Sequence, residues 1–115
     1  MTPDLEKWIG TARDGALLRY SLGLQYAKSG DYEKATLHFS EAVARNPLYS
    51  AAWKGLAGAL ADAGRRDEAL QAYRSGVAAA QKAGDKQAEK EMRVFLRRLE
   101  KAAQPSGGTN PVRKA

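Results

Sequence analysis

The chain has 115 residues, of which 43% are hydrophobic, with a formal net charge of +6 and no cysteine. This length suits one domain with its own core, and the lack of cysteine excludes disulfides, thiolate metal sites and a cysteine nucleophile. No apolar run approaches the ~18 residues of a membrane span, and the acidic N-terminal residues argue against a signal peptide. We therefore expect a soluble, cytoplasmic protein.

Glycine and proline divide the chain into segments in which apolar residues recur at helical spacing. A short helical segment is expected over residues 3–9, with Thr2 as N-cap and Pro3 at the first helical position. Longer helices are predicted over 14–28, 32–45, 50–64, about 67–82 and 86–103, with stops at Gly30, Asn46-Pro47, Gly64 and Gly84. The tail 104–115 is rich in Pro, Gly and Ser and is predicted to be disordered.

The four middle helices form two copies of one unit, related by a shift of 34 residues. With Ala16 as position 1, the residues Leu22, Tyr26, Gly30, Ala35 and Phe39 correspond to Leu56, Leu60, Gly64, Ala69 and Tyr73. A unit of this length cannot bury its apolar face alone and must stack on a neighbour. Small residues, among them Gly23, Gly58 and Gly76, are expected where helices approach closely.

These positions, together with Ala42, Pro47 and Trp53, resemble the tetratricopeptide repeat (TPR), a 34-residue helix–turn–helix. The resemblance covers about residues 16–83, and the whole chain also resembles small bacterial TPR proteins without an assigned activity. It implies an all-α, right-handed α-α superhelix with repeat one at 16–49 and repeat two at 50–83.

Segment 86–103 lacks the residues of a third unit and is predicted to be a capping helix. Its apolar stripe would pack on the stack and consists of Ala88, Met92, Phe95, Leu96, Leu99 and Ala103. The predicted organisation is thus a short N-terminal segment 1–13, a TPR domain 14–103 and the tail 104–115.

No catalytic constellation is visible, and we predict no enzyme, no metal and no cofactor. The single histidine, His38, precedes the core residue Phe39 and is expected on the solvent surface. Four aspartates at helix starts are expected to act as N-caps: Asp14, Asp31, Asp67 and Asp85.

In the TPR family, positions 2, 5, 9, 12 and 13 of the first helix of each unit line the concave face. Carried over, the implied groove residues are Leu17, Tyr20, Leu24, Ala27, Lys28, Ala51, Lys54, Gly58, Ala61 and Asp62. Capture of C-terminal carboxylates, as one TPR subclass performs it, is disfavoured. Tyr20 and Leu24 stand at the lysine and asparagine places, and Asp85 and Glu89 stand where a third unit would need bases.

Leu17, Tyr20 and Leu24 also form a second apolar stripe on the helix 14–28. Leu5, Trp8 and Ile9 of the N-terminal segment could cover this stripe, or the stripe could help to pack the array. It could equally be a ligand or dimer surface. The sequence leaves these alternatives open.

Five of the six net positive charges lie from residue 86 onward, where eight basic residues face three acidic ones. A basic face on the last helix consists of Lys86, Lys90, Arg93, Arg97 and Lys101. We favour a solvated helix face, with an anionic partner as the alternative. Nucleic acid is disfavoured because no aromatic residue alternates with these bases.

The predicted function is therefore non-catalytic protein–protein interaction, with an unidentified protein or peptide bound on the concave face. One alternative is a homodimer, which would supply interface area that two repeats lack. The other is weak binding of an anionic partner by the basic last helix.

Overall fold

The computed structural model describes residues 4–103 as a stack of helices. The elements are η1 (Leu5–Trp8), α1 (Ala16–Lys28), α2 (Tyr32–Arg45), α3 (Ser50–Asp62), α4 (Arg66–Ala83) and α5 (Lys86–Ala103). No strand occurs in this part of the chain, and the N-terminal segment is a single 3-10 turn. The expected cap Thr2, the expected Pro3 start and the expected disordered tail lie outside the described residues.

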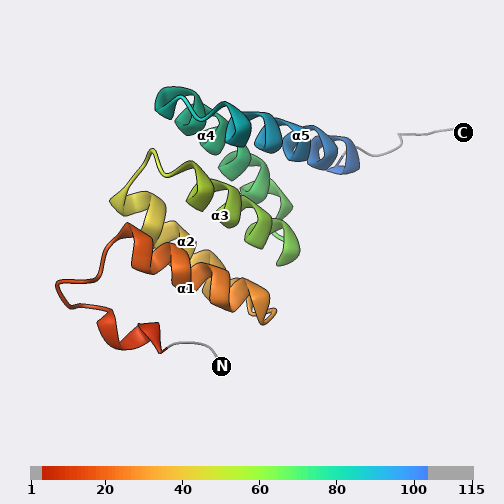
Figure 1. Ribbon diagram of the computed structural model, residues 1–115. Coiled ribbons are helices and arrows are strands. Elements are labelled where there is room, and N and C mark those ends of the chain that lie inside the picture. Colours follow the sequence, from red (N-terminus) through yellow and green to blue (C-terminus); the bar gives the residue numbers. More distant parts are fainter. Residues whose placement is uncertain (1–3, 104–115) are drawn as a thin grey trace, which may run out of the picture.

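The helices form two layers, with α1, α3 and α5 side by side in one and α2 and α4 in the other (Figure 1). Successive helices pack as antiparallel neighbours, and α3 also contacts both α1 and α5. Within residues 4–103, α2 and α4 do not approach each other closely. The layer of α1, α3 and α5 is therefore the inner, more crowded side of a curved stack. The predicted all-α superhelix of helical hairpins is confirmed.

Three glycines end helices in the left-handed conformation, as local sequence predicts. Gly30, Gly64 and Gly84 have φ values of 83°, 80° and 71°. After each glycine a backbone N–H returns to a carbonyl of the last turn, from Asp31 to Tyr26, from Arg65 to Leu60 and from Asp85 to Ala80, each at 2.9 Å. These closures reverse the chain sharply and bring each helix against the one before it.

Two of the four expected aspartate caps are confirmed. Asp31 and Asp85 accept backbone hydrogen bonds from the N–H groups of Lys34 (3.2 Å) and Ala88 (3.1 Å). The expectation for Asp14 and Asp67 is wrong, because the N-cap residues of α1 and α4 are Gly15 and Arg65. Asp67 instead lies in the first turn of α4, and Asp14 joins an ion-pair cluster described below.

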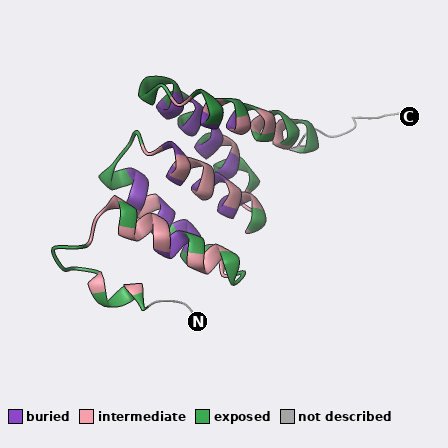
Figure 2. Ribbon diagram, in the orientation of Figure 1, coloured by how far each residue is buried: buried purple, intermediate pink, exposed green. Residues whose placement is uncertain are grey.

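Buried residues gather where the two layers face each other (Figure 2). Phe39 belongs to this core, is 1% exposed and has one of the largest fully buried side chains among the described residues. Gly23 on α1 and Gly55 on α3 form the two sides of its slot. A Cβ at either glycine would lie 2.6 Å from a Phe39 ring carbon. Gly76 similarly admits Met92, whose Sδ would be 2.5 Å from an added Cβ. The expected close approach at Gly58 is wrong, since an added Cβ there meets nothing within 4 Å.

The last helix continues the inner layer, but its register is shifted by two residues from the 34-residue period. α4 has 18 residues where α2 has 14, and only two residues, 84 and 85, separate α4 from α5. As a result, the buried Ala88 and Met92 follow the buried Ala52 and Leu56 by 36 residues. The packing stripe of α5 is confirmed at these positions. Phe95, expected on the same stripe, lies at the edge of the stripe and is 43% exposed. The side chain of Ala103, also expected there, lies outside the described part of the chain.

The N-terminal turn does not cover the second apolar stripe of α1. Leu17 and Leu24 are 70% and 47% exposed, so the alternative of cover by the N-terminal segment is wrong for them. η1 instead attaches elsewhere on α1, where the Tyr26 hydroxyl donates a hydrogen bond to Glu6. Tyr20, the third member of the stripe, turns inward and packs beside Phe39, with ring centroids 5.9 Å apart.

Candidate functional site

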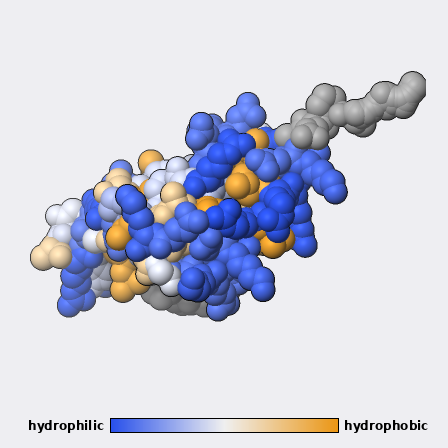
Figure 3. All heavy atoms as spheres, turned by 90° about the horizontal axis from the view of Figure 1, so that it is seen from above, coloured by the Kyte–Doolittle hydropathy of each residue, from blue (hydrophilic) through white to orange (hydrophobic). Residues whose placement is uncertain are grey.

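The solvent-facing surface of α1, α3 and α5, called the concave face below, carries the groove residues expected from sequence. Leu17, Leu24, Lys28 and Asp62 are exposed, whereas the others are partly exposed: Tyr20, Ala27, Ala51, Lys54, Gly58 and Ala61. All ten are thus reached by solvent. Seen from above, apolar patches interrupt a largely hydrophilic surface (Figure 3).

The α1 side of the concave face is apolar. Leu17 and Leu24 project from it, and Tyr20 lies between them along the helix with its ring 5.0 Å from that of Tyr49. The aromatic contacts hold Tyr20 in place, because tilted ring pairs at this separation are favourable. The two leucines have no comparable cover and leave apolar surface in water.

The α3 part of the concave face has no side chain at Gly58 and carries one ion pair to α5. Gly58 faces open space. Lys54 donates to Glu91 across the helix boundary, with Nζ 2.7 Å from Oε1. This hydrogen bond lowers the pKa of the Glu91 carboxyl, so Lys54 and Glu91 largely neutralise each other.

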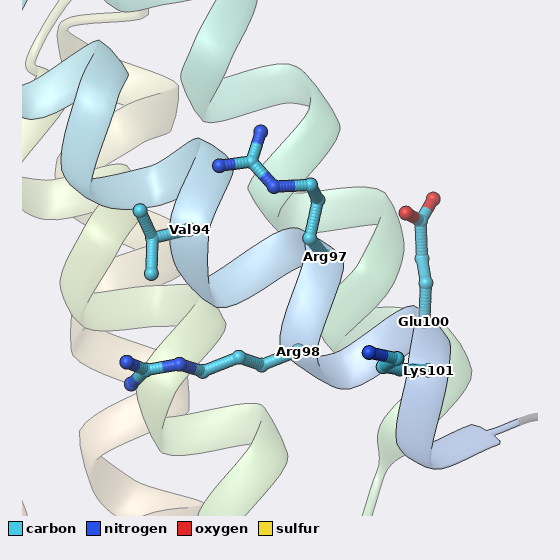
Figure 4. A pocket seen from close by; sticks show the side chains of 5 residues that line it. All are labelled: Val94, Arg97, Arg98, Glu100 and Lys101. Atoms are coloured by element: carbon cyan, nitrogen blue, oxygen red, sulfur yellow. The ribbon is translucent and has the colours of Figure 1, made fainter.

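The α5 side holds two adjoining hollows. The first, of about 570 Å³, is lined by Lys54, Gln87, Lys90, Glu91, Val94 and Phe95. The second, of about 470 Å³, lies along α5 and is lined by Val94, Arg97, Arg98, Glu100 and Lys101 (Figure 4). Val94 belongs to both hollows, so they form one continuous surface. Figure 4 shows Val94 and Arg98 extending to the same side of the helix.

These α5 residues were missing from the groove expected from sequence. The 36-residue register aligns Gln87, Lys90, Val94, Arg97 and Arg98 with Ala51, Lys54, Gly58, Ala61 and Asp62. The sequence carries a signal for this shift, since Gln81 replaces the proline that ends the second helix of unit one. Without proline α4 runs on, and α5 begins later.

The predicted basic face does not form a separate stripe. All five of its residues are exposed: Lys86, Lys90, Arg93, Arg97 and Lys101. Lys90 lines the first hollow, while Arg97 and Lys101 line the second. Arg93 pairs with Glu89 at 2.9 Å, and its hydrogen bond lowers the pKa of the Glu89 carboxyl. Much of the basic face is thus continuous with the concave face.

The expectation of a solvated His38 is wrong, because its side chain is 6% exposed and packs between α1 and α2. It stacks on Tyr26 with ring centroids 5.4 Å apart, and its Nδ1 lies 3.3 Å from Nη1 of Arg19. Burial, reinforced by Arg19, lowers the pKa of His38. A residue next to Phe39 lies only 100° further round the helix, so the flank bearing His38 still faces α1.

Arg19 connects His38 to a cluster around Asp14. Its Nε and Nη2 donate to the Asp14 carboxylate at 2.8 and 3.1 Å, and the Gly10 N–H donates at 2.9 Å. Arg45 of α2 reaches the same carboxylate at 3.5 Å. These hydrogen bonds hold the pKa of Asp14 far below its usual range. The cluster holds the loop before α1 against the first hairpin and presents no nucleophile.

Within residues 4–103, no three His, Cys, Asp or Glu side chains gather in a way that could hold a metal ion. None of the described helices combines the length and hydropathy needed to cross a bilayer.

The fold and this surface define a class of protein, the helical-hairpin repeat proteins, which stack short helix pairs into a curved array. The chain matches the tetratricopeptide repeat over residues 20–84 and belongs to that family. TPR proteins are generally non-catalytic modules for protein–protein interaction.

Three similar proteins cover much of the chain. The TPR repeat-containing protein PA0015 of Pseudomonas aeruginosa is 48% identical over 102 residues, which span 89% of this chain and 97% of that protein. Uncharacterized protein MJ0572 of Methanocaldococcus jannaschii is 39% identical over 59 residues, or 51% of this chain and 69% of that protein. The solution structure of protein BPP2914 from Bordetella parapertussis has a TM-score of 0.75 at 42% identity and covers 89% of this chain and 91% of its own.

Proposed function

We propose that this protein is a non-catalytic interaction module that binds a peptide segment of another protein on its concave face. The observation that carries the proposal is the pair of exposed leucines, Leu17 and Leu24, on the inner layer of the stack. The two leucines lie seven residues apart on one side of α1, with Tyr20 between them, and an apolar patch on a surface is typical of an interaction site. The open space above Gly58 gives a ligand room to approach the same layer.

The dimensions of the face suit a short segment. Packed helices lie about 8–10 Å apart, so the distance from α1 across α3 to α5 is about 16–20 Å. An extended chain advances about 3.3 Å per residue and would cross this distance with about five or six residues. A ligand of this size buries less area than a stable dimer interface, so we expect a weak, reversible contact.

The proposal is tested by selecting ligands from a displayed library of random peptides of about eight residues, enough to cross the face. The selected peptides are then titrated against Leu17→Ser/Leu24→Ser. The matched control is Leu37→Ser/Leu48→Ser, which removes exposed leucines from α2 and the α2–α3 connection. We expect the first variant to lose binding by about tenfold or more, equivalent to 1.4 kcal/mol, and the control to bind as the wild type does.

Two results would contradict the proposal. The first is a library that yields no binder at all, and the second is unchanged affinity of the selected peptides for the Leu17→Ser/Leu24→Ser variant. Circular dichroism of both variants shows whether the helices are intact. Both substitutions remove exposed side chains, so neither variant should unfold.

A further inference from the structure

The concave face is chemically asymmetric from one side to the other. Its α1 side presents Leu17 and Leu24, whereas its α5 side presents Lys90, Arg98 and Lys101 beside Val94. We propose, on the basis of the proposed function, that the bound segment is an acidic peptide with a fixed direction. Its apolar residue lies over α1 and its carboxylates lie over α5.

The bases of α5 that line the two hollows are not paired with acids in the part of the chain that the structure describes. Among the described residues, Lys90, Arg97, Arg98 and Lys101 take part in no ion pair. The acids that line the two hollows are already engaged, since Glu91 binds Lys54 and Glu100 binds Arg74 of α4 at 3.1 Å. A ligand carboxylate would therefore meet uncompensated positive charge there, which favours acidic ligands and speeds their association.

Arg98 lies where the two hollows meet. It lines the second hollow, and its guanidinium carbon lies 6.0 Å from the centroid of the Phe95 ring, which lines the first hollow. The Phe95 ring also stacks on the ring of Tyr73, with the two ring centroids 6.0 Å apart. Arg98 and Phe95 thus place a charge and an apolar edge together next to Val94.

This arrangement differs from the capture of a C-terminal carboxylate. In the observed register, the places where that mode needs bases on a third unit hold Gln87 and Glu91 instead of Asp85 and Glu89. The free bases lie further along α5. We therefore expect recognition of side-chain carboxylates within a segment, without a requirement for a free C-terminus.

A peptide explains the surface better than a nucleic acid does. A polyanion would place phosphates along the whole face, but the α1 side offers it two leucines and no free base except Lys28. The ring of Phe95 is stacked on Tyr73 and offers little for base stacking. Single-stranded DNA therefore serves as a competitor in the test.

The first experiment examines the composition of the selected peptides and their response to charge reversal. We expect Asp and Glu to be enriched toward one end and large apolar residues toward the other. Binding of the tightest peptide to Lys90→Glu/Arg98→Glu should weaken about tenfold or more, equivalent to 1.4 kcal/mol. The control Arg66→Glu/Lys82→Glu changes the net charge equally at exposed positions of α4 and should have less than about a twofold effect. Replacing the peptide carboxylates by amides should weaken wild-type binding as strongly, with little further loss in the double variant.

The second experiment examines direction. A spin label on the acidic end of the peptide should broaden amide signals of residues 90–98, whereas a label on the apolar end should broaden those of residues 17–24. The reverse pattern, or equal broadening of both sets by either label, would overturn the inference.

The outcomes separate this inference from the proposed function. Peptides that require Leu17 and Leu24 but show no acidic enrichment, or bind Lys90→Glu/Arg98→Glu normally, overturn the inference and leave the proposed function intact. Loss of Leu17/Leu24 dependence overturns both. The inference is also overturned if an oligothymidine displaces the peptide and binds this protein more tightly than the peptide does. The basic side would then be assigned to nucleic acid.

Discussion

Replacing Gly55 by alanine would add a methyl group where Phe39 already lies. The new Cβ would be 2.6 Å from Cε1 and 2.7 Å from Cζ of the ring, whereas carbon atoms in favourable contact are about 3.5–4.0 Å apart. Gly23 limits retreat of the ring toward α1, because a Cβ added there would likewise lie 2.6 Å from the ring, which shows that Phe39 already packs closely against the α1 backbone. Phe39 is fully buried, so α3 and α2 must separate or the ring must leave its rotamer.

The free-energy change follows from two opposing effects. Overpacking a well-packed core costs about 1–3 kcal/mol, while alanine is favoured over glycine in a helix interior by about 1 kcal/mol. The contacts of 2.6 and 2.7 Å at Gly55 place this substitution in the upper part of the overpacking range, at a cost of about 2–3 kcal/mol. After subtraction of the helix-propensity gain, we expect a net loss of about 1–2 kcal/mol for Gly55→Ala. The matched change Gly58→Ala, three residues later on the same helix, meets nothing within 4 Å and should gain about 0.5–1 kcal/mol.

Urea unfolding followed by circular dichroism measures both changes. In a domain of this size, 1 kcal/mol corresponds to about 4–8 °C in the thermal midpoint, so the two variants should differ clearly in sign. Phe39→Leu should cost less in the Gly55→Ala background than in the wild type, because the smaller side chain relieves the crowding. Equal stability of Gly55→Ala and Gly58→Ala would refute the reasoning.

Three further predictions concern stability. Burial lowers the pKa of His38, so on acidification the unfolded chain binds a proton at a higher pH than the folded chain does. The thermal midpoint should therefore fall as the pH drops below about 6.5. A midpoint that does not change over this range, together with an NMR titration that shows no lowered pKa for His38, would contradict this. Asp14→Asn should lower the midpoint at neutral pH by removing the acceptor for Arg19 and Arg45. This deficit should shrink below about pH 4, where the wild type progressively loses the contribution of its low-pKa carboxylate, and parallel midpoint curves would exclude it. Gly64→Ala should cost about 1–2 kcal/mol, because φ at Gly64 is 80° and alanine is strained there; urea unfolding without a loss would show that the turn relaxes.

The helix ends could be predicted because their causes are local. A glycine stop followed by an aspartate cap lies within six residues of chain, as at Gly84 and Asp85, and the start of α5 at Lys86 follows from it. The ten expected groove residues of α1 and α3 also follow from position within the unit. Their binding of a ligand stays a proposal.

Other features could not be predicted because they depend on contacts between distant residues. His38 is buried only because Tyr26 and Arg19 of α1 close over it. Gly55 and Gly58 are equivalent as residues in a helix, yet only Gly55 faces Phe39. The part of the candidate site on α5 was missed for a similar reason, because the period of the first two units assigns it the wrong register.

The sequence by itself therefore determined that this protein is a stack of two helical hairpins followed by one more helix, because turn residues and the 34-residue spacing act over short distances. Only the tertiary structure decided how the last helix is rotated about its axis. Four additional residues in α4 and a short connection shift α5 by two residues relative to the repeat, and Met92 then packs against Gly76. This packing turns Lys90 and Arg98 toward the concave face, where they join the leucines of α1 on one surface.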